Sequence, residues 1–538
     1  MGNLGFHPVN HLVNLEEDVV CERATLEPGA GGPLTIESGR PLSAFEIVAF
    51  SISYETDVFN LAAMLSTAGI PLSPEGRAEA GSPLVLVGGV IAFLNPEPLA
   101  PLADVMAIGE AEPILPDFLA AFRASRDQPR PDLLRALAQV PGLYVPSLYQ
   151  VRHDASGQIR DRRALDNSAP ATIARRVSRD LLEPARTRVF CADAEFSEMA
   201  LVELGRGCPH ACRFCAGSYL FRPPRWAPLP ALQSALKEGF QRREVAGLVS
   251  ASATDHPEFP ALCQWLRGQG KKHSLSSLRL DQLTPALLAE IKASGHKTLT
   301  LAPEAGTERL RRVLNKPIRD REIVSAMEMV GVSEIKRLKL YFQVGLPFET
   351  GEDVAAIPEL VAHVKKALAQ GGGKKKWPGV VSVSINPFVP KPGTPFQWHP
   401  MPPMSALKAK LGGLTTALRK LGGITVSGTP VREALVQGLL ARGDRRIGER
   451  LAALVKSGGR ISDLLRAPAD SAPSADWFIH RPRPREEILP WDFLDHGASK
   501  DQLWKEYEKA RLTKITPPCR PGSCRLCAAC ELLAETPQ

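Results

Sequence analysis

The stretch Gly207-Cys208-Pro209-His210-Ala211-Cys212-Arg213-Phe214-Cys215 gathers three cysteines on one short segment. Three residues separate the first two cysteines, and two residues separate the second pair. Free cysteines rarely cluster in this way, so three unrelated buried thiols are a poor explanation. A zinc knuckle or a four-cysteine ferredoxin site needs a fourth cysteine nearby, but the next one is Cys263. The spacing therefore predicts a loop that binds three irons of a 4Fe–4S cube and leaves the fourth iron without a protein ligand.

This segment resembles the cluster loop of the radical S-adenosylmethionine (radical SAM) superfamily, including the aromatic Phe214 directly before the last cysteine. The resemblance implies that Cys208, Cys212 and Cys215 hold the 4Fe–4S cluster and that its open iron binds SAM. It also implies reductive cleavage of SAM to methionine and a 5′-deoxyadenosyl radical, with the electron coming from a donor such as flavodoxin or ferredoxin. No further catalytic residue is assigned.

The composition is typical of a soluble globular protein of more than one domain. The chain has 538 residues, of which 44% are hydrophobic and 23% are charged. No apolar run reaches the roughly 18 residues needed to span a bilayer, and the N-terminus has no secretory signal. Most cysteines fall into two tight clusters, which favours metal ligation over disulfides. We expect a cytoplasmic protein without a membrane partner.

Residues 1–140 alternate strand and helix patterns. Strand patterns at 46–52, 84–89 and 104–112 predict a truncated Rossmann-like domain. It resembles the cobalamin-binding domain that precedes many radical SAM barrels, which makes cobalamin a conceivable cofactor. The chain lacks the Asp-x-His-x-x-Gly motif that would supply the cobalt ligand, so the residues give cobalamin no support, and we expect His7 and His11 to be surface residues. A hairpin and a connector are predicted for residues 141–197.

From residue 198 to 400 the pattern becomes a regular strand–helix repeat. Strands are predicted at 199–205, 246–251, 273–278, 297–302, 338–345 and 380–386, and helices at 228–243, 257–270, 284–294, 306–330 and 351–370. Six such units with right-handed crossovers form a partial (β/α)6 barrel of the radical SAM type. Functional residues should gather at the carboxyl ends of its strands, and the three-cysteine loop follows the first one.

Several strand ends resemble the methylthiotransferase and coproporphyrinogen-dehydrogenase branches of the superfamily. The segment Gly345-Leu346-Pro347-Phe348-Glu349-Thr350 of this chain closely matches a turn of those branches. The resemblance implies that Glu304 accepts the ribose hydroxyls of SAM, although an acid here could also simply stabilise a helix N-terminus. Lys316 and Arg279 compete as partners of the SAM carboxylate. The predicted SAM-binding residues are Phe214, Ser252, Ala253, Thr254, Arg279, Glu304 and Lys316.

Residues 401–538 are predicted to be a basic, mainly helical region that is helical up to about residue 458, with a linker at 467–475. It ends in four cysteines, at positions 519, 524, 527 and 530. Cys519, Cys524, Cys527 and Cys530 could hold either zinc or a second iron–sulfur cluster, and the sequence leaves both open.

The formal net charge of +8 lies mostly in this last region, where 22 Lys and Arg face 15 Asp and Glu. A basic region can bind RNA, so one hypothesis is methylation or methylthiolation of an RNA or ribosomal substrate. An ordinary solvated basic surface explains the charge equally simply. The alternatives are a small-molecule or cofactor-pathway enzyme, with or without cobalamin, and a non-catalytic iron–sulfur scaffold.

Overall fold

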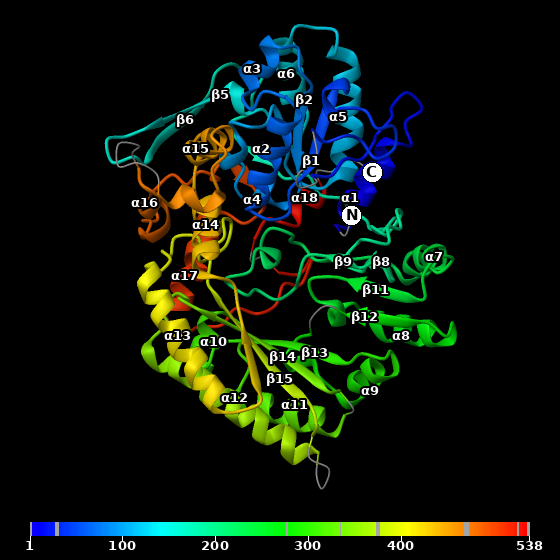
Figure 1. Cartoon of the computed structure of the whole chain (residues 1–538), viewed down its shortest axis with the longest axis vertical. Coiled ribbons are helices and arrows are strands. Elements are labelled where there is room, and N and C mark those ends of the chain that lie inside the picture. The colour runs from blue at the N-terminus through cyan, green and yellow to red at the C-terminus, as the bar shows by residue number, and fades with distance from the viewer. Residues whose placement is uncertain are drawn as a thin grey trace.

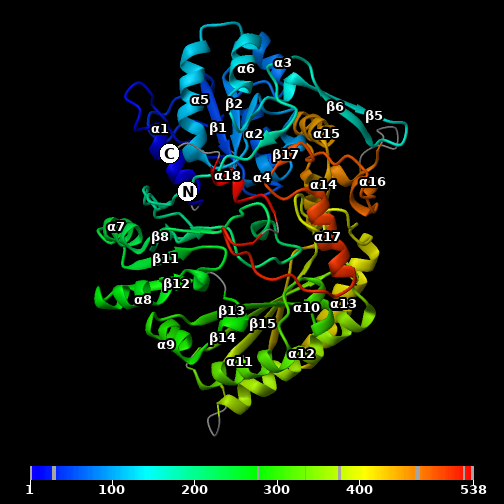
Figure 2. The ribbon, with the colours of Figure 1, turned by 180° about the vertical axis from the view of Figure 1, so that it is seen from behind.

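The computed structural model describes residues 3–26, 32–275, 278–333, 335–372, 377–466, 473–524 and 527–534. An N-terminal α/β layer lies above an open barrel, and the C-terminal segments run between the two (Figure 1). The termini lie near each other in this view and in the view from behind (Figure 2). None of the helices in the described ranges is long and apolar enough to cross a membrane.

The N-terminal sheet has the order β1-β2-β3-β4. Its strands are β1 (Ile47–Ser51), β2 (Leu84–Gly88), β3 (Val105–Ala107) and β4 (Leu143–Tyr144); the first three are parallel and β4 is antiparallel. Every residue of Leu84-Val85-Leu86-Val87 is buried, as expected for a central parallel strand covered on both faces. The helices of this part are α1 (Phe6–Val13), α2 (Asp57–Thr67), α3 (Pro74–Glu79), α4 (Val90–Leu94), α5 (Ala111–Ser125) and α6 (Arg130–Ala138).

The barrel consists of two parallel sheets, with the orders β12-β11-β8 and β13-β14-β15-β16. A parallel bridge between Leu278 and Leu301 joins them at one edge. The strands are β8 (Met199–Glu203), β11 (Val245–Val249), β12 (Lys272–Leu275), β13 (Thr298–Glu304), β14 (Arg337–Val344), β15 (Val380–Pro387) and β16 (Ile424–Ser427). The covering helices are α7 (Leu229–Gly239), α8 (Phe259–Gly268), α9 (Pro285–Ala293), α10 (Glu308–Val313), α11 (Asp320–Val332) and α12 (Gly351–Gly371).

All six predicted barrel strands are present, but two details differ from prediction. The helix expected at 306–330 is two helices, α10 and α11, because Asn315 adopts a φ of 56° and Pro317 follows two residues later. In the region expected to be helical beyond residue 400, β16 extends the second sheet. Its β-branched sequence, Ile424-Thr425-Val426-Ser427, suits an edge strand.

The hairpin predicted for the connector is present as β5 (Tyr149–His153) paired with β6 (Ile159–Ala164). Further along the chain β7 (Ile173–Ala174) pairs with β17 (Leu494–Asp495). The C-terminal helices are α13 (Met404–Lys420), α14 (Val431–Arg442), α15 (Arg445–Lys456), α16 (Ala475–His480), α17 (Lys500–Arg511) and α18 (Glu531–Ala534). Most of the predicted linker, residues 467–472, lies outside the described residues.

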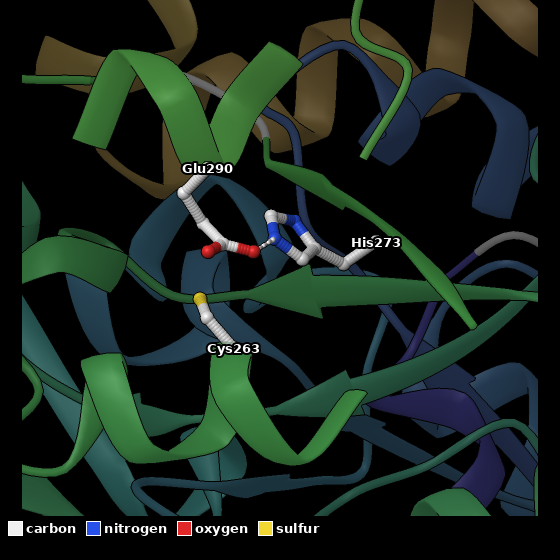
Figure 3. Close-up of side chains that lie close together, drawn as sticks. All are labelled: Cys263, His273 and Glu290. Carbon is white, nitrogen blue, oxygen red and sulfur yellow. Dashed lines mark ion pairs between the residues drawn. The ribbon is translucent and has the colours of Figure 1, made fainter. Parts of the chain in front are cut away.

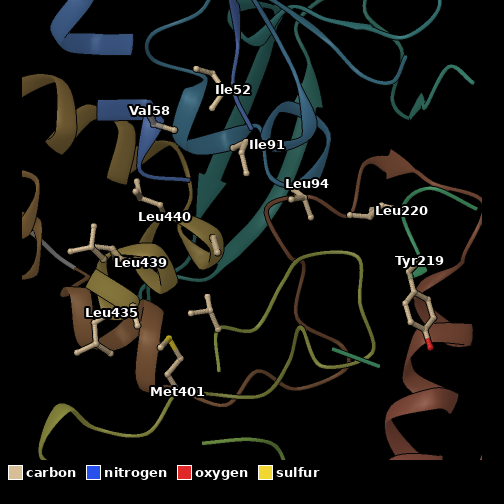
Figure 4. Packing of buried hydrophobic residues seen from close by; sticks show 14 of the residues in the cluster. Ile52, Val58, Ile91, Leu94, Tyr219, Leu220, Met401, Leu435, Leu439 and Leu440 are labelled. Atoms are coloured by element: carbon tan, nitrogen blue, oxygen red, sulfur yellow. The ribbon is translucent and has the colours of Figure 1, made fainter. Parts of the chain in front are cut away.

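One hydrophobic cluster joins the three regions (Figure 4). Ile52, Val58 and Ile91 of the N-terminal sheet and its helices face Leu435 and Leu440 of α14. Tyr219 and Leu220, from the segment just after the three cysteines, belong to the same cluster. The N-terminal layer and the C-terminal helices thus share a core with the loop that carries the candidate site.

The same packing corrects one expectation for the N-terminal domain. His7 was expected at the surface, but only 2% of it is exposed, because α1 packs against the protein and the Nδ1 atom accepts a hydrogen bond from the N–H of Val189. At the C-terminal end of α4, Asn95 donates from its side-chain amide to the carbonyls of Ala441 and Gly443. The C-terminal helices therefore cover the side of the domain that faces the barrel.

Candidate functional site

The three-cysteine loop is closed by a short antiparallel ladder. Strand β8 continues into β9 (Gly205–Arg206), which pairs with β10 (Arg225–Trp226), and residues 207–224 form the loop between them. Gly207 opens the loop with a φ of 83°. A Cβ atom at this position would lie 2.3 Å from the carbonyl oxygen of Phe221, so only glycine fits.

The thiols point into a mostly buried space. Cys208 and Cys212 are 8% and 6% exposed, and Cys215 is half-buried. Burial raises the pKa of the Cys208 thiol to about 12, and the neighbouring Cys212 and Cys215 act in the same direction. The three sulfurs are therefore close enough to influence one another.

The donor set of this loop suits a cluster better than a single ion. A tetrahedral zinc site with Zn–S bonds of about 2.3 Å brings sulfurs to within about 3.8 Å of one another. Among the residues that the structure describes, the one set of three Cys, His, Asp or Glu ligand atoms lying mutually within 4.8 Å is elsewhere, at Cys263, His273 and Glu290. The donor set of the loop, three thiols with no fourth protein ligand, fits a 4Fe–4S cube with one open iron.

A hydrogen-bonded chain ties the cluster loop to the end of β11. The Nε2 atom of His210 lies 2.8 Å from the Oδ2 atom of Asp255. The side chain of Gln282 also donates to Asp255 and accepts from the hydroxyl of Thr254. The predicted turn at Ser252–Thr254 thus lies beside the loop, with Ser252 and Ala253 both buried. In the sequence, the histidine within the cysteine motif was the one indication of this contact.

Glu304 ends β13 in an unusual conformation. Its φ is 70°, a region that a non-glycine residue adopts only when its surroundings fix it, and the strand register shifts between Leu301 and Glu304. Its Oε1 atom accepts from the Nζ atom of Lys316 at 3.1 Å, and its Oε2 atom accepts from the Nε2 atom of Gln343 at 2.9 Å. Such strain at a buried carboxylate is typical of a ligand-binding position.

Two cations lie close to the cysteines. Burial raises the pKa of the Cys212 thiol, while the charges of Lys316 and then Arg279 oppose that rise. Lys316 is already paired with Glu304. Arg279 is held by Asp281 through two hydrogen bonds of 3.1 and 2.7 Å and also interacts electrostatically with Cys208. The structure therefore brings Arg279, Glu304 and Lys316 together around Cys212.

Phe214 lies in an apolar environment. It is partly buried against the apolar cluster that includes Leu310, Leu314 and Phe388. This packing accounts for an aromatic residue here without a ligand, so a role beside the adenine of SAM stays a prediction.

Arg213 and Asn315, which sequence reasoning missed, fasten the C-terminal segment to the loop. Arg213 is fully buried and donates to the carbonyls of Val313 and Lys514 at 2.9 and 2.6 Å. The amide of Asn315 donates to the carbonyls of Ala211 and Thr516, and its oxygen accepts from the N–H of Thr516 at 2.8 Å. These contacts join positions 100 to 300 residues apart, for which the sequence carried no local signal.

The four terminal cysteines therefore begin next to the first three. The N–H of Cys519 donates to the carbonyl of Pro209 at 2.7 Å. Burial raises the pKa of the Cys519 thiol to about 12, while the positive charge of Arg222 opposes it and Cys524 and Cys527 add to it. The following residues are fixed by a 2.7 Å bond from the N–H of Ala528 to the carbonyl of Gly497.

A charged network connects the loop to the N-terminal domain. Glu110, at the end of β3, binds Arg206 at 2.7 Å and Arg225 at 2.7 Å, on the two strands that close the loop. Burial alone raises the pKa of Glu110, but the charges of Arg206, Arg225 and Arg175 outweigh it and lower that pKa to about 2. Glu110 is therefore charged at neutral pH.

Comparison with known families agrees with this geometry. Residues 5–146 match the model described as radical SAM proteins, N-terminal, and residues 202–361 match the model of the radical SAM superfamily. The chain belongs to the radical SAM superfamily. It is thus a radical SAM enzyme, and 4Fe–4S and SAM are the cofactors that this superfamily implies.

Individual proteins are similar over most of the chain. An uncharacterized protein of Methanocaldococcus jannaschii, MJ0966, is 29% identical over 422 residues, which cover 78% of this chain and 83% of that protein. Among solved structures, the radical SAM methyltransferase TsrM from Kitasatospora setae gives a TM-score of 0.48 at 12% identity, covering 78% of this chain and 86% of TsrM. The cobalamin-dependent SAM radical enzyme OxsB gives 0.41 at 13% identity, with coverages of 87% and 70%.

Proposed function

We propose that this enzyme reductively cleaves SAM at a 4Fe–4S cluster held by Cys208, Cys212 and Cys215. The observation that carries the proposal is the three-thiol loop with Arg279, Glu304 and Lys316 gathered around Cys212. When bound there, the cluster supplies the electron that breaks a carbon–sulfur bond of SAM, giving methionine and the 5′-deoxyadenosyl radical. The electron donor is a small redox protein such as flavodoxin or ferredoxin.

The protein's own residues bind and orient SAM. Arg279 pairs with the SAM carboxylate, because its guanidinium offers two parallel donors and lies near both Cys208 and Cys212. Lys316 is the weaker choice, because a single ammonium cannot form a bidentate pair with a carboxylate. Both cations already have an acidic partner, Lys316 in Glu304 at 3.1 Å and Arg279 in Asp281 at 2.7 Å. Glu304 accepts the ribose hydroxyls, and Lys316 and Gln343 hold its carboxylate in position.

The remaining predicted contacts complete the SAM site. The turn at Ser252, Ala253 and Thr254 takes the SAM amino group through its backbone, supported by its place beside His210 and Asp255. Phe214 packs beside the adenine of SAM. The C-terminal segment covers the cluster loop through Arg213 and Asn315, so it limits the access of water.

For the terminal cysteines we propose a second iron–sulfur cluster rather than zinc. The 2.7 Å bond from Cys519 to Pro209 supports a position next to the radical cluster, where a second redox centre could pass electrons or anchor a substrate. Iron and zinc analysis of the purified protein separates the two.

For the substrate we favour a small molecule or cofactor intermediate over RNA or the ribosome. Part of the positive charge that indicated RNA is matched by acids from elsewhere in the chain: Lys410 pairs with Glu349, and Arg445 pairs with Glu97. Arg442 is fully buried and donates four hydrogen bonds to backbone carbonyl oxygens. RNA binding that weakens steeply with salt would restore the RNA hypothesis.

The N-terminal domain is assigned to docking rather than to cobalamin. The residues along its barrel-facing edge are occupied: Glu55 binds Lys391 and accepts from Gln437 at 2.9 Å, and Asn95 binds α14. No step of the proposed reaction therefore uses cobalamin. The same contacts support residues 1–140, 141–197, 198–400 and 401–538 as structural units that act together.

Two experiments test the function. Anaerobically reconstituted protein given a reductant should convert SAM into 5′-deoxyadenosine, and no conversion would contradict the proposal. Comparison of metabolites and modified nucleosides between cells with and without the gene identifies the substrate class. A metabolite that accumulates in the deletion strain is expected, whereas a missing modified nucleoside would establish an RNA substrate instead.

A further inference from the structure

Three buried polar side chains meet between strand β12 and the helices α8 and α9 (Figure 3). Cys263 lies on α8, His273 on β12 and Glu290 on α9. Their exposed fractions are 2%, 2% and 9%. One ligand atom from each lies within 4.8 Å of the other two. A thiol, an imidazole and a carboxylate are the three donor types that bind zinc in proteins.

These side chains lack the partners that buried polar groups normally have. Both ring nitrogens of His273 and the Oε1 atom of Glu290 are buried without a hydrogen bond in the structure. The nearest approach, from Nε2 to Oε1, is 3.5 Å, which is too long for a good hydrogen bond. Buried polar groups in folded proteins normally have hydrogen-bond partners, so Oε1 and the ring nitrogen nearest to it call for a shared partner.

An ion pair between the two residues does not explain the arrangement. The contact between Nε2 and Oε1, at 3.5 Å, is longer than a charge-assisted hydrogen bond of about 2.7–2.9 Å. The carboxylate already has a cation, because Arg267 donates to its Oε2 atom. The Oε1 atom of Glu290 and the Nε2 atom of His273 therefore face each other without a hydrogen bond.

We propose that Cys263, His273 and Glu290 bind one divalent metal ion, with zinc the best match to this donor set. The thiol releases its proton to solvent on binding, since zinc is held by the thiolate. Arg267 then orients the ligating carboxylate from outside. The fourth position falls to His296 or to a water molecule: the His296 ring lies 5.6 Å from that of His273, and its Nε2 atom is buried without a partner.

The ion has a structural rather than a catalytic role. His273 is near the start of β12, whereas the cluster loop follows the carboxyl end of the parallel strand β8. The two sites are therefore at opposite ends of the same sheet. A metal ion here ties α8 and α9 to β12, where the strand is followed by residues outside the described part of the chain. The loss of the ion should lower stability while leaving the chemistry of SAM intact.

The test uses the full-length protein, zinc as the probe and three matched variants. After chelation and readdition of zinc at a few micromolar, the wild-type protein should bind one equivalent more than His273→Asn or Cys263→Ser, and its melting temperature should rise. Cys191→Ser, which removes a thiol outside the set, should bind as much zinc as the wild type. Because the terminal cysteines can also bind zinc, only the difference between proteins counts.

Cobalt provides a second readout that does not depend on stability. Co²⁺ added to the wild type should give a thiolate-to-cobalt charge-transfer band that Cys263→Ser reduces and Cys191→Ser does not. Glu290→Gln keeps the size of the side chain and so guards against simple misfolding. Equal metal binding by the wild type, His273→Asn and Glu290→Gln would overturn the proposal. SAM cleavage should persist in these variants. A failure of the metal-site proposal can therefore be told apart from a failure of the proposed function.

Discussion

The backbone N–H of Cys519 donates a 2.7 Å hydrogen bond to the carbonyl oxygen of Pro209. Pro209 follows the first cysteine of the radical loop, and Cys519 is the first of the four terminal cysteines. Asn315 strengthens the same junction by bonding Ala211 on one side and Thr516 on the other. The two cysteine motifs, far apart in the chain, are therefore parts of one structural unit.

Removal of the Asn315 side chain should release the C-terminal segment. Asn315→Gly keeps the left-handed backbone, whose φ is 56°, but loses three hydrogen bonds to Ala211 and Thr516. We expect a loss of about 2 kcal/mol in stability and faster tryptic cleavage after Lys514. Gly497→Ala should have a similar effect, because its Cβ atom would lie 2.3 Å from the Cα atom of Ala529. Unchanged cleavage in both variants would show that the segment is held by other contacts.

Arg279→Lys should weaken the binding of SAM. A lysine keeps the charge but loses the two parallel donors that a carboxylate can accept. We expect KM for SAM to rise about tenfold, equivalent to about 1.4 kcal/mol, with a smaller change in kcat. Arg312→Lys, at an exposed position on α10, is the matched control and should leave KM unchanged. An unchanged KM for SAM in Arg279→Lys would exclude Arg279 as the bidentate partner of the carboxylate.

Glu304→Gln should impair SAM binding without unfolding the protein. The variant keeps the side-chain size and can still bond to Gln343, but it loses the charged pair with Lys316. A neutral amide is a poorer acceptor for two ribose hydroxyls, so we expect KM for SAM to rise about tenfold or more. 2′-Deoxyadenosyl and 3′-deoxyadenosyl analogues of SAM should then lose little further affinity. An undiminished preference for the full ribose would exclude Glu304 as its acceptor.

Glu110 should make stability depend on pH in the acid range. Its pKa is about 2 in the folded protein and about 4.3 when unfolded, so its contribution is complete above pH 5 and is lost as pH falls towards 2. The difference corresponds to about 3 kcal/mol. Glu110→Gln leaves Arg206, Arg225 and Arg175 facing one another, so it should lower stability at pH 7 and flatten the acid dependence. Parallel pH profiles for the two proteins would contradict this role.

The sequence predicted the repeating elements well and their long-range contacts poorly. Each barrel strand was recognisable because its buried run was bounded by turn residues, and the three-cysteine spacing located the cluster loop. The break at Asn315 was missed although Pro317 signalled it, and β16 was missed because four residues among helices give a weak pattern. Arg213, Gln343 and Glu110 owe their roles to partners brought in by folding, which no local pattern records.

If the three thiols of the loop support the cleavage of SAM, the yield of 5′-deoxyadenosine depends on each of them. Wild type, Cys212→Ala and Cys191→Ser should be reconstituted anaerobically with iron and sulfide, then given SAM and a strong reductant. We expect the wild type and Cys191→Ser to form 5′-deoxyadenosine and methionine in equal amounts, and Cys212→Ala to form none. Formation of 5′-deoxyadenosine by Cys212→Ala at the wild-type rate would contradict it.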